Sequence, residues 1–222
     1  MPATEDQAES LAPTLRLEEP IPAFRARTTQ GEISSSDYLG KWLILFSHPA
    51  DFTPVCTSEF VAMQQSLSEF SDLNCNILGL SVDSVYSHIA WISSIKKDFG
   101  VEITFPIIED ISMSIAMAFG MIHEESTGTA TVRSVFFIDD KGILRALIHY
   151  PMNVGRSISE ILRTVSALQA ADESKMSAPE GWQAGDDLVI APPTSVAQAD
   201  IFSTAADSPG ESWYYSKAPG SA

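Results

Sequence analysis

The chain has 222 residues, and 45% of them are hydrophobic, so it is long enough for one large domain with an extension. Acidic residues outnumber Lys plus Arg by 29 to 13, and the net charge of −16 argues against nucleic acid and anionic membranes as partners. No apolar stretch approaches the ~20 residues of a membrane span, and the acidic, polar start is unlike a secretory signal. Two cysteines without such a signal indicate a reducing, cytoplasmic compartment and no disulfide framework.

The first predicted elements follow an N-terminal tail of residues 1–16. Residues 24–33 predict a hairpin that turns at Gln30–Gly31. Residues 42–46 are a short apolar run, which predicts a buried strand. A helix is expected to begin at residue 53 or 54 and to end near residue 70, since proline is tolerated in the first helical turn.

Strand and helix patterns then alternate along the chain. The expected elements are a strand over 76–83, a helix over 86–99 that ends at Gly100, a short strand within 105–110, a short helix over 111–119, a hairpin over 134–150 with its turn at 140–142, and a helix over 158–169. This order predicts an α/β fold with a mostly parallel central sheet, an N-terminal hairpin and a C-terminal extension. A thioredoxin-like sheet is the leading candidate for the domain over residues 17–171.

The amino-acid composition of the sequence changes after residue 171. Residues 172–222 hold five prolines and eight acidic against two basic side chains. They also hold large apolar groups, which include the run Trp213–Tyr214–Tyr215. We expect an ordered C-terminal arm that packs on a neighbouring chain or on its own domain, with a disordered tail as the alternative.

The main chemical question concerns Cys56, which follows the predicted strand in the segment SHPADFTPVCTSEF. A metal site is disfavoured, since there is no Cys-x-x-Cys and the four histidines show no ligand spacing. A dithiol redox site would need a second cysteine at position 59, which is a glutamate. A third interpretation, that Cys56 is an inert buried cysteine, remains open. The first turn of a helix, however, offers unpaired N–H groups and the positive end of the helix dipole, and both favour a thiolate.

The segment Pro49-Ala-Asp-Phe-Thr53-Pro-Val-Cys56 resembles the P-x-x-x-T-x-x-C signature of peroxiredoxins. Arg133, directly before the predicted strand SVFFI, stands where that family has its active-site arginine.

Other segments resemble the one-cysteine, peroxiredoxin 6-like branch of the AhpC/TSA family. They are YPMNVGRSISEILRTVSALQ, PEGWQAGDDLVIAPP, and His48 in the sequence SHPADFTPVCTSE. The resemblance covers residues 17 to 193.

This resemblance implies a thiol peroxidase that reduces hydrogen peroxide and organic hydroperoxides through a cysteine sulfenic acid. Cys56 would attack the peroxide, Thr53 would hold and orient it, and Arg133 would stabilise the thiolate and the charge that develops on oxygen. Pro49 would shield the site from water. We expect Glu59 to orient the arginine, while His48 fits a role in the substrate pocket and simple packing equally well.

The resemblance also implies partners. No metal, haem or flavin cofactor is expected, and an external thiol such as thioredoxin or glutathione would supply the electrons. The family forms homodimers, which in some members assemble into larger rings. Cys75 is expected to be an inert thiol, since resolving cysteines usually lie in a C-terminal segment; a resolving role within the domain, as in some relatives, is the alternative. The alternative function is a peroxide sensor or a holdase chaperone on the same fold.

Overall fold

The computed structural model describes residues 15–122, 128–199 and 210–220, so the expected N-terminal tail lies almost wholly outside the described residues. The chain divides into two compact units, one that ends at Arg156 and one that starts at Ser157. The last long helix lies in the second unit, and the domain boundary expected at residue 171 stays a prediction.

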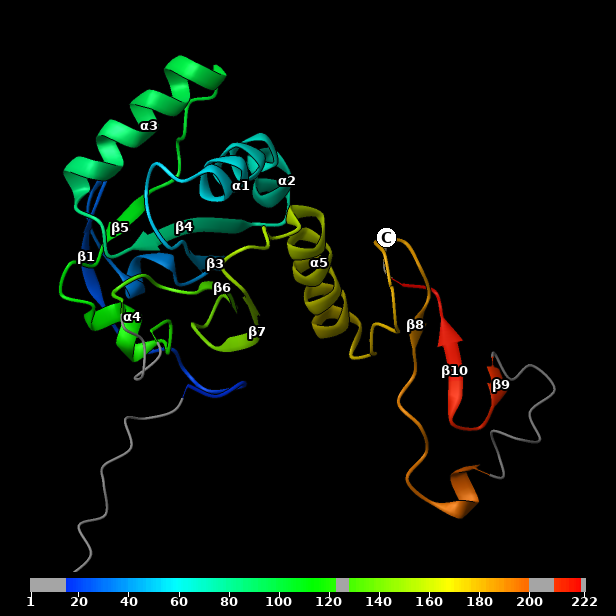
Figure 1. Cartoon of the computed structure of the whole chain (residues 1–222). Coiled ribbons are helices and arrows are strands. Elements are labelled where there is room, and N and C mark those ends of the chain that lie inside the picture. The colour runs from blue at the N-terminus through cyan, green and yellow to red at the C-terminus, as the bar shows by residue number, and fades with distance from the viewer. Residues whose placement is uncertain (1–14, 123–127, 200–209, 221–222) are drawn as a thin grey trace, which may run out of the picture. The chain divides into compact units, whose positions relative to one another are not determined.

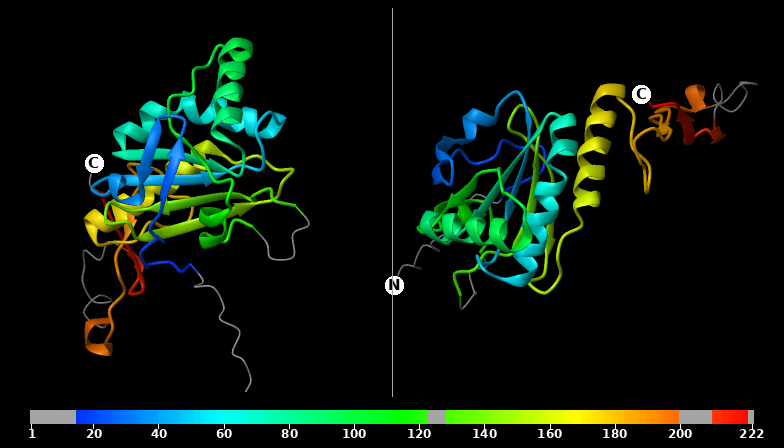
Figure 2. Two further views of the ribbon diagram at one scale, coloured as in Figure 1. Left: turned by 90° about the vertical axis from the view of Figure 1, so that its left-hand side faces the viewer. Right: turned by 90° about the horizontal axis from the view of Figure 1, so that it is seen from above.

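The first unit is built on a seven-stranded sheet with the strand order β2-β1-β5-β4-β3-β6-β7 (Figure 1). Its strands are β1 (Arg25–Thr28), β2 (Gly31–Ser34), β3 (Trp42–Ser47), β4 (Cys75–Ser81), β5 (Ile107–Glu109), β6 (Arg133–Ile138) and β7 (Leu144–Tyr150). The α/β class and both predicted hairpins, β1–β2 and β6–β7, are confirmed, and the β1–β2 hairpin lies at one edge of the sheet (Figure 2).

The expectation of a mostly parallel sheet is wrong. Only β3–β4 and β4–β5 are parallel among the described strand pairs of this sheet. The N-terminal hairpin joins β5 in the antiparallel sense, and β6 lies antiparallel to β3. Sequence patterns identify buried strands but not the direction of a partner far away in the chain, and this is why the error arose.

Side chains of β3 alternate between the two faces of the sheet, and both faces are covered. Leu43 and Leu45 join a buried cluster with Phe119, which directly follows the helix α4 (Ser114–Ala118). Phe46 points to the other face, where its ring lies 5.2 Å from that of Phe60 in α1 (Pro54–Gln65). The run WLILFS is buried at every position because it has packing partners on both sides.

The helix α3 (Val85–Phe99) lies on the same face as α1, since its Trp91 ring is 4.6 Å from the Phe60 ring. Gly100 ends α3 with φ of 70°, a left-handed conformation that glycine adopts readily, as the sequence predicts. The helix expected from residue 53 or 54 to 70 is two helices, α1 and α2 (Leu67–Asp72), which meet at Ser66.

The remaining elements are a short 3-10 helix, η1 (Ser35–Tyr38), in the first unit, and the helix α5 (Ile158–Ser174) with a small sheet in the second. That sheet has the order β8-β10-β9, with β8 (Leu188–Val189), β9 (Gly210–Ser212) and β10 (Tyr215–Ala218). In the described part of the chain, no helix is both long and apolar enough to cross a membrane.

Candidate active site

Cys56 lies in the first turn of α1, directly after the loop of residues 48–53 that leaves the end of β3. Pro54 occupies the start of the helix, where its missing N–H is no loss. The Cys56 side chain is fully buried. Its sulfur therefore lies near the unpaired N–H groups and the positive dipole end of α1, in a site with little access to water.

Arg133 lies against this sulfur. It begins β6, which pairs with β3 and so brings the arginine beside the end of that strand. Its Nη1 donates to Cys56 Sγ at 3.2 Å. Nε and Nη2 both donate to the carbonyl oxygen of Met152, at 3.1 and 3.0 Å, and this fixes the plane of the guanidinium.

Glu59 lies one helical turn beyond Cys56 and joins two arginines. Its Oε2 accepts from Arg133 Nη1 at 2.9 Å and from Arg156 Nη2 at 2.7 Å. Its Oε1 accepts from the backbone N–H and from Nε of Arg156, at 2.8 and 2.9 Å. The Glu59 carboxylate therefore lies between two guanidinium groups, and its role in orienting Arg133 stays a prediction.

Arg156 is the site residue that sequence reasoning missed. Besides its bonds to Glu59, its Nη1 donates to the carbonyl oxygens of Ser47 at 2.7 Å and Ser134 at 3.0 Å. The sequence signal for Arg156 was its place in YPMNVGRSIS, part of a segment that resembles the one-cysteine branch.

The buried charges at this site do not sum to zero unless Cys56 is a thiolate. Arg133, Arg156 and Glu59 are all at most 7% exposed, and together they carry two positive charges and one negative charge. An uncompensated buried charge is costly, of the order of several kcal/mol. A thiolate at Cys56 supplies the missing negative charge, and the hydrogen bond from Arg133 is stronger to a thiolate than to a thiol.

Thr53 and Pro49 lie in the loop directly before α1. Thr53 is the residue that precedes α1, and its Oγ1 donates to the carbonyl oxygen of Ala50 at 2.9 Å. The hydroxyl proton is engaged in this hydrogen bond, while the lone pairs of the oxygen can still accept a hydrogen bond from a bound molecule. Pro49 is buried in the loop, and its role in excluding water stays a prediction.

His48 lies in a buried group of three side chains. Its Nε2 is 2.9 Å from Asp51 Oδ1, and Asp51 also lies 2.8 Å from Nδ1 of His88. Among the described residues these three are the group that could hold a metal ion by position. Their nitrogen–oxygen distances are those of hydrogen bonds, so we describe them as a hydrogen-bonded group.

Cys75 lies at the other end of the sheet from Cys56. It pairs with Trp42 at the start of β3, whereas Ser47 at the end of β3 pairs with Leu80. Five residues of strand span about 16 Å, at ~3.3 Å per residue. Burial raises the pKa of Cys75 to about 12, and the sequence-based expectation of an inert thiol agrees with both observations.

Two family models match most of the chain. The AhpC/TSA family matches residues 17–147, and the C-terminal domain of 1-Cys peroxiredoxin matches residues 167–204. A peroxiredoxin of Aquifex aeolicus is 49% identical over 195 residues, which are 83% of this chain and 88% of that protein. Peroxiredoxin 2 of Caldanaerobacter subterraneus is 52% identical over 174 residues, which are 78% of this chain and 79% of that protein.

Solved structures give the same result. The yeast mitochondrial 1-Cys peroxiredoxin, studied for thiol resolution via glutathione and thioredoxin systems, has a TM-score of 0.80 at 38% identity and covers 92% of this chain and 100% of its own. A cysteine-to-serine mutant of peroxiredoxin 6 of Arenicola marina has a TM-score of 0.80 at 33% identity, over 93% of this chain and 99% of that one. The similarity therefore extends over both units.

Proposed function

The chain belongs to the peroxiredoxins of the AhpC/TSA family and is a thiol peroxidase of the one-cysteine type, and we propose that Cys56 performs its chemistry through a sulfenic acid. The observation that carries the proposal is the 3.2 Å hydrogen bond from Arg133 to Cys56 Sγ, in a buried site that lacks one negative charge. The substrates that we propose are hydrogen peroxide and organic hydroperoxides.

In the first step, the thiolate of Cys56 attacks one peroxide oxygen in line with the O–O bond. A sulfur–oxygen bond forms, and the O–O bond breaks with its electron pair on the leaving oxygen. That oxygen takes up a proton and departs as water or an alcohol. Sulfur is oxidised by two electrons, and Cys56 becomes a sulfenic acid.

Two neighbours support this step. Arg133 stabilises the negative charge as it moves from sulfur to the leaving oxygen. Thr53 accepts the peroxide O–H in a hydrogen bond, because its own proton is bound to Ala50. Glu59 and Arg156 hold Arg133 in place, and Pro49 excludes water.

In the second step, an external thiol attacks the sulfenic acid, a mixed disulfide forms and water leaves. A second thiol then releases the Cys56 thiol and carries away the oxidised reductant. Cys75 is too far away to take the place of that thiol. Thioredoxin and glutathione are the proposed donor classes, and the yeast relative is described with both systems.

We also propose a homodimer in the cytoplasm. The second unit matches the C-terminal domain of 1-Cys peroxiredoxin, and we assign residues from 172 onward to a dimerisation arm.

The proposal is tested by turnover with a thiol donor. Peroxide consumption coupled to NADPH, with thioredoxin or glutathione and the matching reductase, should be sustained in the native protein. Cys56→Ser should abolish it, whereas Cys75→Ser should retain most of it, because only Cys56 contacts Arg133. Equal loss of activity in both variants would show that the one-cysteine mechanism is wrong.

A further inference from the structure

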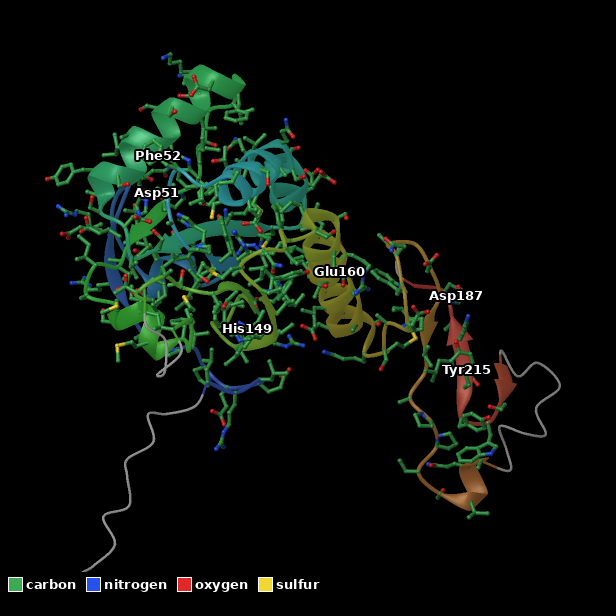
Figure 3. The ribbon with its side chains drawn as sticks, in the orientation of Figure 1. Asp51, Phe52, His149, Glu160, Asp187 and Tyr215 are labelled. Atoms are coloured by element: carbon green, nitrogen blue, oxygen red, sulfur yellow. The ribbon has the colours of Figure 1, made fainter. Side chains whose placement is uncertain are left out.

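Three buried side chains beside the active-site loop have no assigned part in the peroxidase reaction as described above. Asp51 lies on the loop itself, His48 begins it, and His88 lies on α3. Nδ1 of His88 is 3.0 and 2.8 Å from the two carboxylate oxygens of Asp51, and Nε2 of His48 is 2.9 Å from Oδ1. Both histidines are fully buried. Figure 3 shows Asp51 close to Phe52 near α3.

The hydrogen bonds determine where the protons lie. Nε2 of His88 is 3.1 Å from the carbonyl oxygen of Ile108, and a carbonyl can only accept, so this nitrogen carries a proton. Burial by itself would raise the pKa of Asp51, but the hydrogen bonds from His48 and His88 outweigh it and hold that pKa well below its ordinary value. An ionised carboxylate also only accepts. Nδ1 of His88 therefore carries a second proton, and His88 is an imidazolium.

The other charged groups nearby do not change this assignment. Burial lowers the pKa of His48, partly opposed by its bond to Asp51, so His48 is neutral with its proton on Nε2. The hydrogen bond from the backbone N–H of Val85 lowers the pKa of Glu109 on β5, and Arg27 and His88 lower it further. The positive charge of Arg156 also lowers the pKa of His48 slightly. The group thus holds one cation and one anion, His88 and Asp51, in direct contact.

The backbone next to Asp51 needs such an anchor. Phe52 has φ of 56°, a left-handed conformation that strains the backbone of a non-glycine residue. Its side chain is 58% exposed, so packing of Phe52 itself does little to hold the strained backbone. Asp51 is held at both ends, because its N–H donates to Asp83 Oδ2 at 3.0 Å and its carboxylate contacts His88.

We propose that His88, as an imidazolium, is a positioning residue of the peroxidase: its ion pair with Asp51 holds the strained loop that places Pro49 and Thr53 over Cys56. The inference rests on the proposed role of Cys56. Removal of one partner leaves the other charge buried and unpaired, which is strongly destabilising for the local structure. The loop should then loosen around a thiolate that Arg133 still stabilises.

The test compares two reactions of the same thiolate. Reaction with peroxide needs a positioned loop, whereas alkylation by iodoacetamide needs only a thiolate and access. In His88→Gln, the second-order rate constant with hydrogen peroxide should fall about 10-fold or more, as for other misplaced reacting groups. The alkylation rate should stay the same or rise. Asp51→Asn should give the same pattern, and the double variant should be no worse than either one.

The protonation state is tested separately from activity. Nitrogen-15 NMR of histidine-labelled native protein at neutral pH should show both nitrogens of His88 protonated and His48 protonated at Nε2 alone. Asp51→Asn should convert His88 to a neutral ring. His149→Gln, which removes a histidine outside this group, should leave both reaction rates of Cys56 unchanged.

A neutral His88 in the native protein would overturn the proposal, even where the variants do not fold. So would equal losses in the two rates of His88→Gln, or no loss in either. A native protein that does not react with peroxide at all would refute the proposed function instead, and the NMR result would still report on the ion pair.

Discussion

At the scale of single residues, the reactivity of Cys56 depends on the charges buried around it. Arg133, Arg156 and Glu59 leave one positive charge that the thiolate neutralises. If Arg133 is removed, the remaining charges of Arg156 and Glu59 cancel, and the thiolate becomes the uncompensated ion. Charge balance and the direct hydrogen bond therefore favour the thiolate through the same residue.

Arg133→Ala should slow the reaction with hydrogen peroxide by about 100-fold or more, by analogy with the loss of an oxyanion-hole donor. Alkylation of Cys56 at neutral pH should slow as well, because the thiolate loses its partner. Arg133→Lys should recover only part of the rate, since an ammonium cannot bond Met152 and Cys56 in the same planar arrangement. Arg25→Ala, at an exposed position of β1, is the matched control. An unchanged pH profile for alkylation would contradict the role of Arg133.

The two cysteines should differ in their reaction with an alkylating reagent. Burial raises the pKa of Cys75 to about 12, so its thiolate is scarce at neutral pH. Native protein treated with iodoacetamide at neutral pH should gain one adduct, and peptide mapping should place it on Cys56. In denaturant, both cysteines should react. Modification of Cys75 at a similar rate in the native protein would show that its raised pKa does not protect it.

At the scale of elements, the register of β3 and β4 decides how the protein responds to peroxide. Cys75 starts β4 beside the start of β3, while Cys56 lies beyond the other end of β3. A disulfide requires Cα atoms within ~7 Å, and the length of β3 alone exceeds that distance. The sulfenic acid therefore has no internal thiol within reach and must wait for an external one.

A short peroxide pulse without reductant should accordingly add oxygen to Cys56 and form no disulfide. Intact-mass spectrometry should show gains of two and then three oxygen atoms as sulfinic and sulfonic acids accumulate. The masses of Cys75→Ser should change in the same way, whereas Cys56→Ser should gain none of this oxygen on cysteine. A loss of two hydrogens that is blocked by Cys75→Ser would show that the chain resolves its own sulfenic acid.

Local sequence patterns predicted most elements of the first unit but not their pairing. The turn at 140–142, the helix end at Gly100 and the start of α1 at Pro54 depend on nearby residues, and all three were predicted. The antiparallel pairing of β6 with β3 depends on segments about 90 residues apart. It has no local signature.

The difference between local and distant partners also explains which residues of the candidate site could be predicted. Pro49, Thr53 and Cys56 lie within one segment and share a motif, so the sequence was sufficient to name them. The contact of Arg156 with Glu59 joins residues 97 positions apart, and that of His88 with Asp51 joins residues 37 positions apart. Such partners become visible only when the fold brings the segments together.

At the scale of the whole molecule, two surfaces are suited to contact with a second copy of the chain. The seven-stranded sheet ends in β7, which pairs on one side only among the described strands. The turn between β9 and β10 carries Trp213 and Tyr214, which are 46% and 62% exposed. The centres of their rings lie 5.5 Å apart. Large aromatic side chains together on a surface are typical of interaction sites.

Sedimentation velocity should therefore find a species of twice the 24.1 kDa chain mass at micromolar concentration. The double variant Trp213→Ser/Tyr214→Ser should weaken the dimer by about 10-fold or more in Kd, because aromatic residues of this kind carry much of the energy of an interface. Val196→Ser is the matched control, since Val196 is 78% exposed in the same unit but lies apart in sequence from the aromatic turn. Peroxide reactivity of Cys56 measured with the monomeric variant would then show whether the site works without the partner. A native protein that sediments as a monomer throughout, or a double variant that dimerises as well as the native chain, would rule out this role for the aromatic turn.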